Sequence, residues 1–513
     1  MNINHTTSVG ADVLKQEPLY CDDLPTHPRP ADGMILVTGG TGYIGGRLIH
    51  ELLARGYSVR VMVRKSSPEH VERWPGVEIV VADASDVASL TVALKGIHTA
   101  YYLIHSLLLG PKEFEASDLS NARNFREAAS ANGVSRIIYL GGLGDVRTLL
   151  SPHLRSRMQV AAELGSGTVP ATVLRAAVII GSGSASYEII QHLVRRLAVI
   201  AIPRWGRTKC QPISVRDVIR YLVGVLEHPE TSGQSYDIGG PEVLTYEKML
   251  RVVADVLGKK RLFIPVIVSD VRLYAYICGL LTPVPAPITR SLMEGLRNDV
   301  ICLDSRITEL VPFSRVAYRD AVREALTLEA KDSVHTRWSD SYPPHHELSI
   351  KLHELPQAPR YSASASVVTS RSSNDLFKSV CLIGGKQGWS HGNWMWRLRG
   401  MLDKLLMGVG TTRGRRSSST LRVNDVVDFW RVEALHKNRM LLLRAEMKLP
   451  GLAWLKFSID PDNGQNRLSV VAYYDTHTLY GKLYWYVFLP FHGYLFGRLV
   501  YKISKRELDP AKD

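Results

Sequence analysis

The sequence predicts two folded domains of different class. The first is a doubly wound α/β domain with a parallel sheet and a small lobe, and the second is an α+β domain in which a sheet grips a helix. From residue 34 to about residue 260, short apolar runs alternate with amphipathic helical stretches, which is typical of a parallel sheet covered on both faces. Beyond residue 360, strand-like runs follow one another and lead into a long apolar segment. The 513 residues suffice for both cores.

The elements of the first domain are expected in alternating order. The apolar runs predict strands at 34–38, 58–63, 78–81, 99–104, 135–140 and 171–180, and helices at 44–54, 87–94 and 118–131. Beyond residue 181 the alternation loosens, and helices at 187–197, 215–227 and 246–257 predict a small lobe at the edge of the sheet where substrates usually bind.

The second domain is expected to contain strands at 361–369, 426–435, 439–448, 453–459 and 467–474, a helix at 373–380 and a long helix from about 479. Asp462-Asn463-Gly464 predicts a hairpin turn. One further helical face is indicated by apolar residues at helical spacing, namely Trp394, Leu398, Met401, Leu402 and Leu405.

Changes in composition predict the domain boundaries. Residues 1–32 are polar and lack an apolar signal core, so we expect a flexible tail. The first domain spans 33–327, a linker rich in proline and histidine spans 328–359, the second domain spans 360–505, and 506–513 form a tail. The linker histidines lack the cysteine or carboxylate spacing of a metal site, so no metal is predicted; they are His335, His345, His346 and His353.

The charge and cysteine content limit the classes of partner. The chain has 63 Lys and Arg against 49 Asp and Glu, a net charge of +14, which favours anionic partners. No run of basic residues interleaved with aromatics indicates a nucleic-acid groove, so no nucleic acid is expected. The five cysteines are scattered without CxxC spacing, so neither a disulfide framework nor a zinc site is predicted, which suits the cytoplasm.

The longest apolar stretch covers the fifteen residues 483–497 and contains Pro490. A helix needs about 20 apolar residues to cross a bilayer, so the stretch is interpreted first as a buried helix. The alternative is a segment lying on a membrane surface, which would make the protein peripheral at the inner face of the membrane.

The strongest motif follows the first strand and reads Gly39-Gly40-Thr41-Gly42-Tyr43-Ile44-Gly45. In this pattern the first glycine permits a tight turn, the second lets the backbone approach a pyrophosphate, and the third lets the helix pack close to the strand. The N-terminus of the following helix supplies unpaired N–H groups for the phosphates. Because a strand precedes the motif and a helix follows it, the sequence predicts a dinucleotide site.

The second strand ends in Arg64-Lys65-Ser66. An NAD site places an acidic residue about 20 residues after the glycines to bind the ribose hydroxyls. Here two cations stand in that region, and an arginine can hold a 2′-phosphate with two hydrogen bonds. NADP(H) is therefore predicted over NAD(H), and the alternative is a solvated strand end.

Together these residues resemble the extended and atypical short-chain dehydrogenase/reductase superfamily, which has a Rossmann fold, over about residues 34–330. The ends of the third, fourth and fifth strands carry the same resemblance, which implies that Asp83 meets the adenine and that the other segments line the cofactor; these are Asp83-Ala84, Leu103-Ile104-His105 and Gly141. The chain also resembles bacterial proteins that add a C-terminal domain of unknown function of the DUF2867 type. More distantly it is similar to NmrA-like NADP sensors and to the 39-kDa accessory subunit of respiratory complex I.

The resemblance fails at the catalytic residues. Active members use a Ser and a Tyr-x-x-x-Lys pair, whereas Gly141 or Gly142 stands at the Ser position and His153 and Arg157 have the spacing of the pair. In one hypothesis His153 is the proton donor, since imidazole titrates near neutrality, and Arg157 anchors the nicotinamide ribose. In the other, both are ordinary polar residues of a helix. The candidates for proton transfer are, in order, His153, Tyr139 and His105.

The function predicted first is that of an NADP(H)-dependent oxidoreductase or isomerase acting on a hydrophobic molecule of quinone, lipid or polyketide type. The alternative is a non-catalytic NADP(H)-binding redox sensor or assembly factor. The second domain resembles START-like helix-grip proteins, which implies an apolar cavity. Its candidate lining residues are Trp389, Trp394, Trp396, Trp430, Trp454, Tyr473, Trp485 and Phe488, with Lys386, Trp389 and His391 at the mouth. The sequence predicts no oligomeric state.

Overall fold

The computed structural model describes residues 19–105, 114–144, 150–267, 270–334, 336–341, 350–417 and 420–507. The chain divides into two compact units. Unit 1 comprises Met1–Ala275 and Pro287–Ser341, and unit 2 comprises Tyr276–Ala286 and Tyr342–Asp513. Each unit is described by itself.

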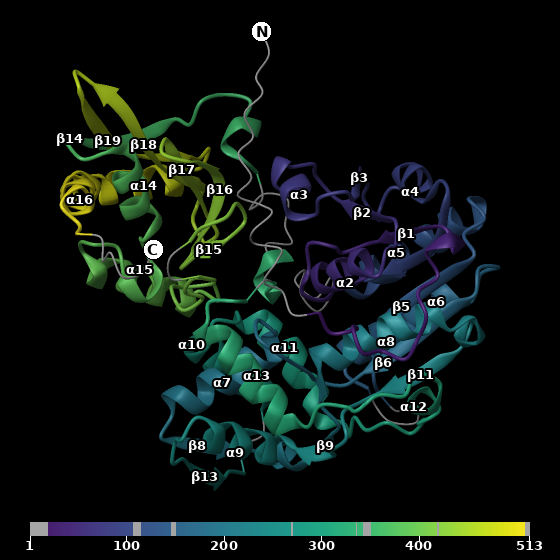
Figure 1. The fold of residues 1–513 in the computed structure, drawn as a ribbon. Helices are drawn as coiled ribbons and strands as arrows, with labels where there is room; N and C mark the ends of the chain where they lie inside the picture. The colour runs from purple at the N-terminus through teal and green to yellow at the C-terminus, as the bar shows by residue number, and fades with distance from the viewer. Residues whose placement is uncertain are drawn as a thin grey trace. The chain divides into compact units, whose positions relative to one another are not determined.

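Unit 1 is built on a seven-stranded parallel sheet with the strand order β11-β6-β5-β4-β1-β2-β3 (Figure 1). The strands are β1 Met34–Val37, β2 Val59–Val63, β3 Glu78–Val81, β4 Ile97–Tyr102, β5 Arg136–Gly142, β6 Ala171–Ala176 and β11 Ser235–Ile238. The strand order reverses at β1, which has β2 on one side and β4 on the other. In open α/β sheets, ligands bind at the carboxyl ends of the strands beside such a switch point.

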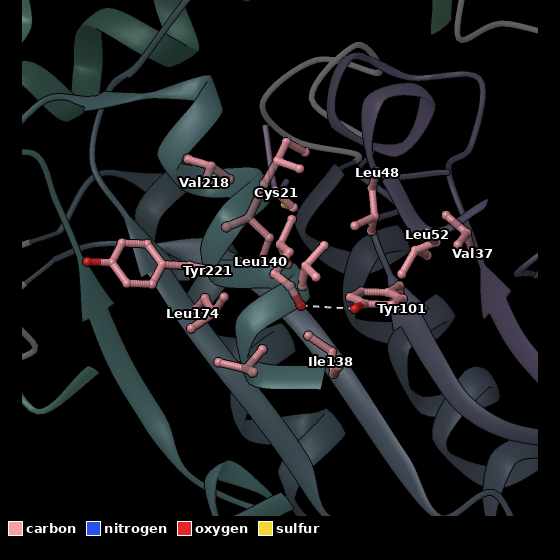
Figure 2. Close-up of a cluster of buried hydrophobic side chains, with 14 of the residues drawn as sticks. Cys21, Val37, Leu48, Leu52, Tyr101, Ile138, Leu140, Leu174, Val218 and Tyr221 are labelled. Atoms are coloured by element: carbon pink, nitrogen blue, oxygen red, sulfur yellow. Dashed lines mark hydrogen bonds between the residues drawn. The ribbon is translucent and has the colours of Figure 1, made fainter. Parts of the chain in front are cut away.

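Helices cover both faces of this sheet. Neighbouring residues of a strand point to opposite faces, and the apolar residues on each face pack against helices. Val37 and Tyr101 belong to a core shared with α2 Tyr43–Ala54 and α8 Val215–Glu227, and Figure 2 shows this core with the hydrogen bond from the Tyr101 hydroxyl to the Leu222 carbonyl. Residues of the alternate register pack with α4 Val87–Leu94, α5 Phe114–Ala131 and α6 Pro152–Gly165. The predicted doubly wound class is confirmed.

Short elements follow β6. Three two-stranded pairs are β7 Ile179–Ile180 with β10 Ile213–Ser214, β8 Val199–Ile202 with β13 Leu262–Pro265, and β9 Lys209–Cys210 with β12 Leu244–Thr245. The further helices are α3 Pro68–Arg73, α7 Ala185–Arg196, α9 Tyr246–Val256, α10 Val271–Leu281, α11 Ala286–Glu294, α12 Ile307–Leu310 and α13 Tyr318–Ala330. The alternation weakens after β6 as expected.

Residues 19–32 do not form the flexible tail that their polarity predicts. Tyr20 and Cys21 are buried in the core of unit 1, and the Glu51 carboxylate accepts hydrogen bonds from both of their backbone N–H groups, at 2.5 and 3.3 Å. Arg220 donates to the Tyr20 carbonyl at 2.7 Å, and Arg55 donates to the Cys21 carbonyl at 2.8 Å. The tail prediction is wrong for this segment because charged partners far along the chain satisfy its backbone.

Residues 336–341 fall in the range predicted to be a linker, yet they pack on unit 1. The Thr336 hydroxyl donates to the Tyr43 carbonyl at 2.9 Å. The Trp338 indole N–H donates to Glu188 Oε2 at 3.0 Å. This segment therefore covers the start of α2 after α13 has ended.

Unit 2 contains a six-stranded antiparallel sheet with the order β14-β19-β18-β17-β16-β15. Its strands are β14 Tyr361–Thr369, β15 Val426–Val427, β16 Trp430–His436, β17 Met440–Ala445, β18 Leu452–Asp462 and β19 Gln465–Asp475, and its helices are α14 Ser373–Cys381, α15 Asn393–Leu405 and α16 Leu479–Ser504. Asn463 and Gly464 have φ of 48° and 79°, as a tight hairpin turn requires. The C-terminal half of α16 packs into the core of the sheet through Leu499 and Val500, so the α+β class is also confirmed.

Candidate functional site

The loop between β1 and α2 is shaped by glycines that leave no room for a side chain. Gly39 has φ of +64°, and a Cβ there would lie 2.7 Å from the Leu103 carbonyl oxygen. A Cβ at Gly45 would lie 2.4 Å from the Gly39 carbonyl oxygen. The first turn of α2 therefore lies directly on the loop, as the third glycine of a dinucleotide motif requires.

Thr38 fixes this loop to the end of β4. Its hydroxyl donates to the Tyr101 carbonyl at 2.9 Å and accepts from the Leu103 N–H at 2.9 Å. The segment Leu103–Ile104–His105 is thereby held beside the glycine loop. The sequence analysis did not single out Thr38, because nothing in a lone threonine before a glycine indicates a partner on another strand.

The N-terminus of α2 supplies the phosphate-binding geometry that the motif predicts. Gly42 precedes the helix in an extended conformation, without a side-chain cap, and the N–H groups of the first turn, from Tyr43 to Gly45, point out of the helix end. The Tyr43 hydroxyl is buried and has no hydrogen-bond partner among the described residues.

At the β2 and β3 side of the loop lie the residues predicted to hold the adenosine. Arg64 and Ser66 are exposed and Lys65 is half-buried. Partial burial raises the pKa of Asp83, but hydrogen bonds from Ser85 and the charge of Arg64 outweigh it and lower the pKa overall. Asp83 is thus a carboxylate fixed by Ser85, with Oδ1 2.6 Å from the Ser85 hydroxyl, and the positive charge of Arg64 acts on it.

At the β4 and β5 side, the structure brings two predicted residues together. The rings of His105 and His153 have centroids 5.1 Å apart. Asp118, which is buried on α5, lies 3.4 Å from His105 Nδ1 and 3.4 Å from the Ser156 hydroxyl. His105 Nε2 and His153 Nδ1 are buried and have no hydrogen-bond partner within the part of the chain that the structure describes. Two ring nitrogens are therefore available to another group.

Burial controls the charge of this pair. It lowers the pKa of His105 below the usual value, and the Arg157 charge adds to the effect, although Asp118 opposes it. It also lowers the pKa of His153 well below the usual value, with the His105 and Arg157 charges acting in the same direction. Both imidazoles are neutral at pH 7. The expectation that His153 titrates near neutrality is therefore wrong, because it took no account of burial.

The remaining predicted catalytic residues are engaged by the protein. Tyr139 is fully buried on the α4–α6 side of the sheet, burial raises its pKa to about 12, and its hydroxyl donates to the Arg157 carbonyl at 3.3 Å. Tyr139 is therefore wrong as a proton donor to a substrate. The Arg157 guanidinium donates to the Leu140 carbonyl at 2.6 Å. Gly141 is buried at the end of β5, where a Cβ would lie 3.1 Å from the Tyr139 ring.

Sequence reasoning missed Asp118. It begins the predicted helix at 118–131 and carries no motif, so only the tertiary packing of α5 against β4 could reveal it. Among the described residues, no group of three or more His, Cys, Asp or Glu side chains is arranged to hold a metal ion.

The residues predicted to line a cavity in unit 2 occupy different environments. Five tryptophans are buried, namely Trp389, Trp396, Trp430, Trp454 and Trp485, whereas Trp394 is 67% exposed. Charged groups share this interior, because Glu446 is buried between Arg413 and Arg431. Trp394 is therefore wrong as a lining residue.

The sequence profile of the NmrA-like family matches residues 31–294, more than half of the chain. The chain belongs to the NmrA-like family. Residues 357–499 match a second family, described as a protein of unknown function (DUF2867). The predicted resemblance to NmrA-like proteins and to the DUF2867 type is confirmed, and unit 1 of this NmrA-like protein has the NAD(P)-binding fold of the atypical short-chain dehydrogenases/reductases.

Several curated relatives are similar over unit 1. The chain is 27% identical over 231 residues to NADH dehydrogenase (ubiquinone) 1 alpha subcomplex subunit 9 of Arabidopsis thaliana, covering 43% of this chain and 57% of that protein. It is 25% identical over 267 residues to the (4-alkanoyl-5-oxo-2,5-dihydrofuran-3-yl)methyl phosphate reductase of Streptomyces griseus, covering 51% of this chain and 86% of that protein. The match thus spans little more than half the length of the Arabidopsis subunit.

The chain is also similar to an assembly factor and to a reductase of known structure. A photosystem II assembly factor of Trieres chinensis is 22% identical over 226 residues, covering 44% of this chain and 69% of that protein. The crystal structure of the Citrobacter sp. triphenylmethane reductase complexed with NADP(H) aligns with a TM-score of 0.48 and 20% identity, covering 57% of this chain and 99% of that one.

Adding one methyl group to the loop tests its geometry. Gly45→Ala places a Cβ against the Gly39 carbonyl oxygen, so α2 must move away from the loop and its N–H groups leave the phosphates. We expect NADP(H) binding, measured by fluorescence titration, to weaken by about tenfold or more. Gly165→Ala is the control, since a Cβ there meets no atom within 4 Å. Equal affinity in both variants would contradict the site.

Removing one histidine tests the neutral pair through its pH dependence. Because the folded pKa of His153 lies below the unfolded value, the unfolded chain binds more protons as the pH falls below about 6.5, and stability is lost on acidification. His153→Gln should lose less stability between about pH 7 and about pH 5 than the wild type, by up to about 1.4 kcal/mol per pH unit. Urea denaturation at several pH values measures this.

The exposed His27, changed to Gln in the same way, controls for the loss of a histidine as such and should follow the wild-type profile. Parallel pH profiles of His153→Gln and the wild type would show that His153 is not held uncharged by burial.

Proposed function

We propose that this NmrA-like protein is an NADP(H)-dependent reductase of a hydrophobic small molecule. The observation that carries the proposal is the buried, neutral His105–His153 pair beside the glycine loop, with two ring nitrogens unpaired among the described residues. Perturbed titratable groups next to a cofactor loop are candidates for chemistry. The Streptomyces relative at 25% identity is named as a reductase, which supports the same class of reaction.

The glycine loop fits the diphosphate of a dinucleotide. Side chains are excluded there by the Gly39 and Gly45 contacts, so backbone N–H groups are the groups that face a ligand. A dinucleotide bound at this switch point would have its adenosine near the ends of β2 and β3 and its nicotinamide near the ends of β4 and β5. Asp83 is the adenine partner by family resemblance, and Arg64 and Lys65 are the partners of a 2′-phosphate.

When bound, a nicotinamide would supply a hydride to an electron-poor carbon or quinone oxygen of the acceptor. A neutral imidazole N–H would hydrogen-bond the negative charge that develops there, and solvent would supply the proton that completes the reduction. Asp118 accepts from His105 Nδ1 at 3.4 Å, which leaves His105 Nε2 as an acceptor, whereas His153 Nδ1 is free to donate. His153 is therefore the proposed donor and His105 with Asp118 positions it. A neutral donor of this kind stabilises developing negative charge without a buried cation.

A non-catalytic, NADP(H)-binding role is the second candidate. It is favoured by the engagement of Arg157 and Tyr139 with backbone carbonyls, which leaves neither free for the roles that the resemblance implies. Two relatives are named as a subunit of a respiratory complex and as an assembly factor. This candidate requires tight cofactor binding without turnover.

Cofactor preference is tested at the end of β2. Arg64→Ala removes the proposed partner of the 2′-phosphate, and a hydrogen bond to a charged group is worth about 1.5–3 kcal/mol. We expect NADPH affinity to fall by about tenfold to about a hundredfold and NADH affinity to change much less. Arg319→Ala, at an exposed arginine on α13, is the control. Parallel losses for both nucleotides would contradict 2′-phosphate binding by Arg64.

Turnover decides between the two candidates. The purified chain is mixed with NADPH and a panel of quinones and enones, and the absorbance of NADPH is followed. The reductase predicts oxidation with at least one acceptor, and His153→Phe should lower kcat by about a hundredfold or more while NADPH affinity stays unchanged. Tight NADPH binding with no oxidation by any acceptor would favour the non-catalytic role, and absence of NADPH binding would exclude both.

A further inference from the structure

Helix α15 of unit 2 has the reverse of the polarity expected for a helix at a water-exposed surface. Trp396 is buried, but five other apolar residues of α15 recur at helical spacing and are exposed; they are Trp394, Leu398, Met401, Leu402 and Leu405. Trp394 is 67% exposed and Met401 is 54% exposed. A surface helix normally turns such a stripe towards the core.

Two charged residues of α15, Asp403 and Lys404, are buried on its inner side and fix this orientation. The Lys404 ammonium donates to the carbonyls of Gly279, Leu280 and Thr282 at 3.0, 2.9 and 2.5 Å. The Asp403 carboxylate accepts from the backbone N–H groups of Lys448 and Gly410 at 2.7 and 2.8 Å. Rotating the stripe inward would leave both charges buried without these partners, at a high cost in free energy. The outward apolar stripe is therefore built into unit 2.

The N-terminal half of α16 exposes a second apolar stripe. Its exposed side chains are Leu479, Tyr480, Leu483, Tyr486, Val487, Phe491 and Tyr494. Trp485 anchors this half to the sheet by stacking on Tyr474, with centroids 5.6 Å apart. From Leu495 onward the helix turns most of its apolar residues into the core instead, and Tyr501 is the large apolar side chain still exposed there.

The two stripes meet where α15 begins. The His391 ring lies 5.6 Å from the Tyr494 ring, and a Cβ at Gly392 would lie 2.6 Å from Leu495. We call the exposed apolar side chains of these two stripes the apolar face. On α15 they are Trp394, Leu398, Met401, Leu402 and Leu405, and on α16 they are Leu479, Tyr480, Leu483, Tyr486, Val487, Phe491 and Tyr494.

The charges that α15 and α16 themselves expose are of one sign. Helix α16 carries Lys482, Arg498 and Lys502 and no acidic residue, and the exposed charge of α15 is Arg397. Trp and Tyr side chains, which prefer the boundary between water and lipid, make up much of the face. Among the described residues, no helix combines the length and apolar composition needed to cross a membrane.

We infer that the apolar face binds the surface of an anionic lipid bilayer, with α15 and the first half of α16 lying in the interface. Exposed apolar area gains free energy by entering the acyl boundary, and basic residues beside it are attracted to anionic headgroups. A protein partner would be expected to bring polar pairs of both signs to its rim, whereas this rim is basic. The inference does not rest on the proposed reductase activity.

Vesicle co-sedimentation of the full chain without NADPH tests the inference. Phosphatidylcholine vesicles are compared with vesicles containing about 30% phosphatidylglycerol, at about 0.05 M and about 0.5 M salt. We expect the wild type to sediment with the anionic vesicles and to be partly released by salt. Met401→Gln with Leu405→Gln, and separately Leu483→Gln with Val487→Gln, should each lower the partition coefficient by about tenfold or more.

Val71→Gln with Val92→Gln is the matched control, because these valines are 64% and 67% exposed on α3 and α4 of unit 1, and it should sediment like the wild type. Circular dichroism confirms that every variant is folded. The inference is overturned if the wild type stays in the supernatant with both vesicles at low salt, or if the two face variants bind as the control does. It is also overturned if light scattering shows a dimer that the face variants dissociate and no vesicle binding, since the apolar face would then join two copies of the chain.

Discussion

The contact between the first turn of α2 and the carbonyl of Gly39 is the constraint on which the site depends. No side chain fits at Gly45, so helix and loop approach at backbone distance, and the helix end stays aimed at the space above β1. Thr38 extends the same constraint to β4 through its two hydrogen bonds. Because Leu103–His105 directly follow β4, a backbone contact in the glycine loop also sets where His105 can lie.

Features of the site that depend on a local sequence pattern could be predicted, whereas those that depend on tertiary packing could not. The glycine loop was predictable because a glycine pattern between a strand and a helix has one common physical use. The alternation of side chains along β5 could have excluded Tyr139, since Ile137 and Tyr139 share the face towards α6 while Ile138 and Leu140 share the other. Asp118 was beyond prediction, because its meeting with His105 depends on how α5 packs. The burial of Tyr20 and Cys21 likewise depends on Glu51, Arg55 and Arg220.

The neutral histidine pair shows how burial outweighs a nearby carboxylate. Asp118 would raise the pKa of both rings if it acted alone, yet desolvation and the positive charge of Arg157 have the larger effect. A neutral pair suits the proposed hydride transfer, since a neutral N–H can hydrogen-bond developing negative charge without the free-energy cost of burying an imidazolium. The Arg157 charge helps to lower the pKa of both histidines, and its hydrogen bond to the Leu140 carbonyl fixes its position. Its role is then electrostatic, which differs from the ribose anchor implied by resemblance.

The apolar face of an amphipathic helix points inward in unit 1 and outward in unit 2, as α8 and α15 show. In unit 1, α8 turns an almost continuous apolar face to the sheet and buries it. In unit 2, α15 buries Asp403 and Lys404 beside Trp396 and leaves an apolar stripe outside. Such an arrangement loses hydrophobic stabilisation in water and gains hydrogen bonds that merely replace those made to solvent. The inferred membrane surface would return that stabilisation by covering the stripe, and the basic residues of α16 would favour an anionic surface. A reductase held at such a surface would meet a hydrophobic substrate where that substrate is concentrated.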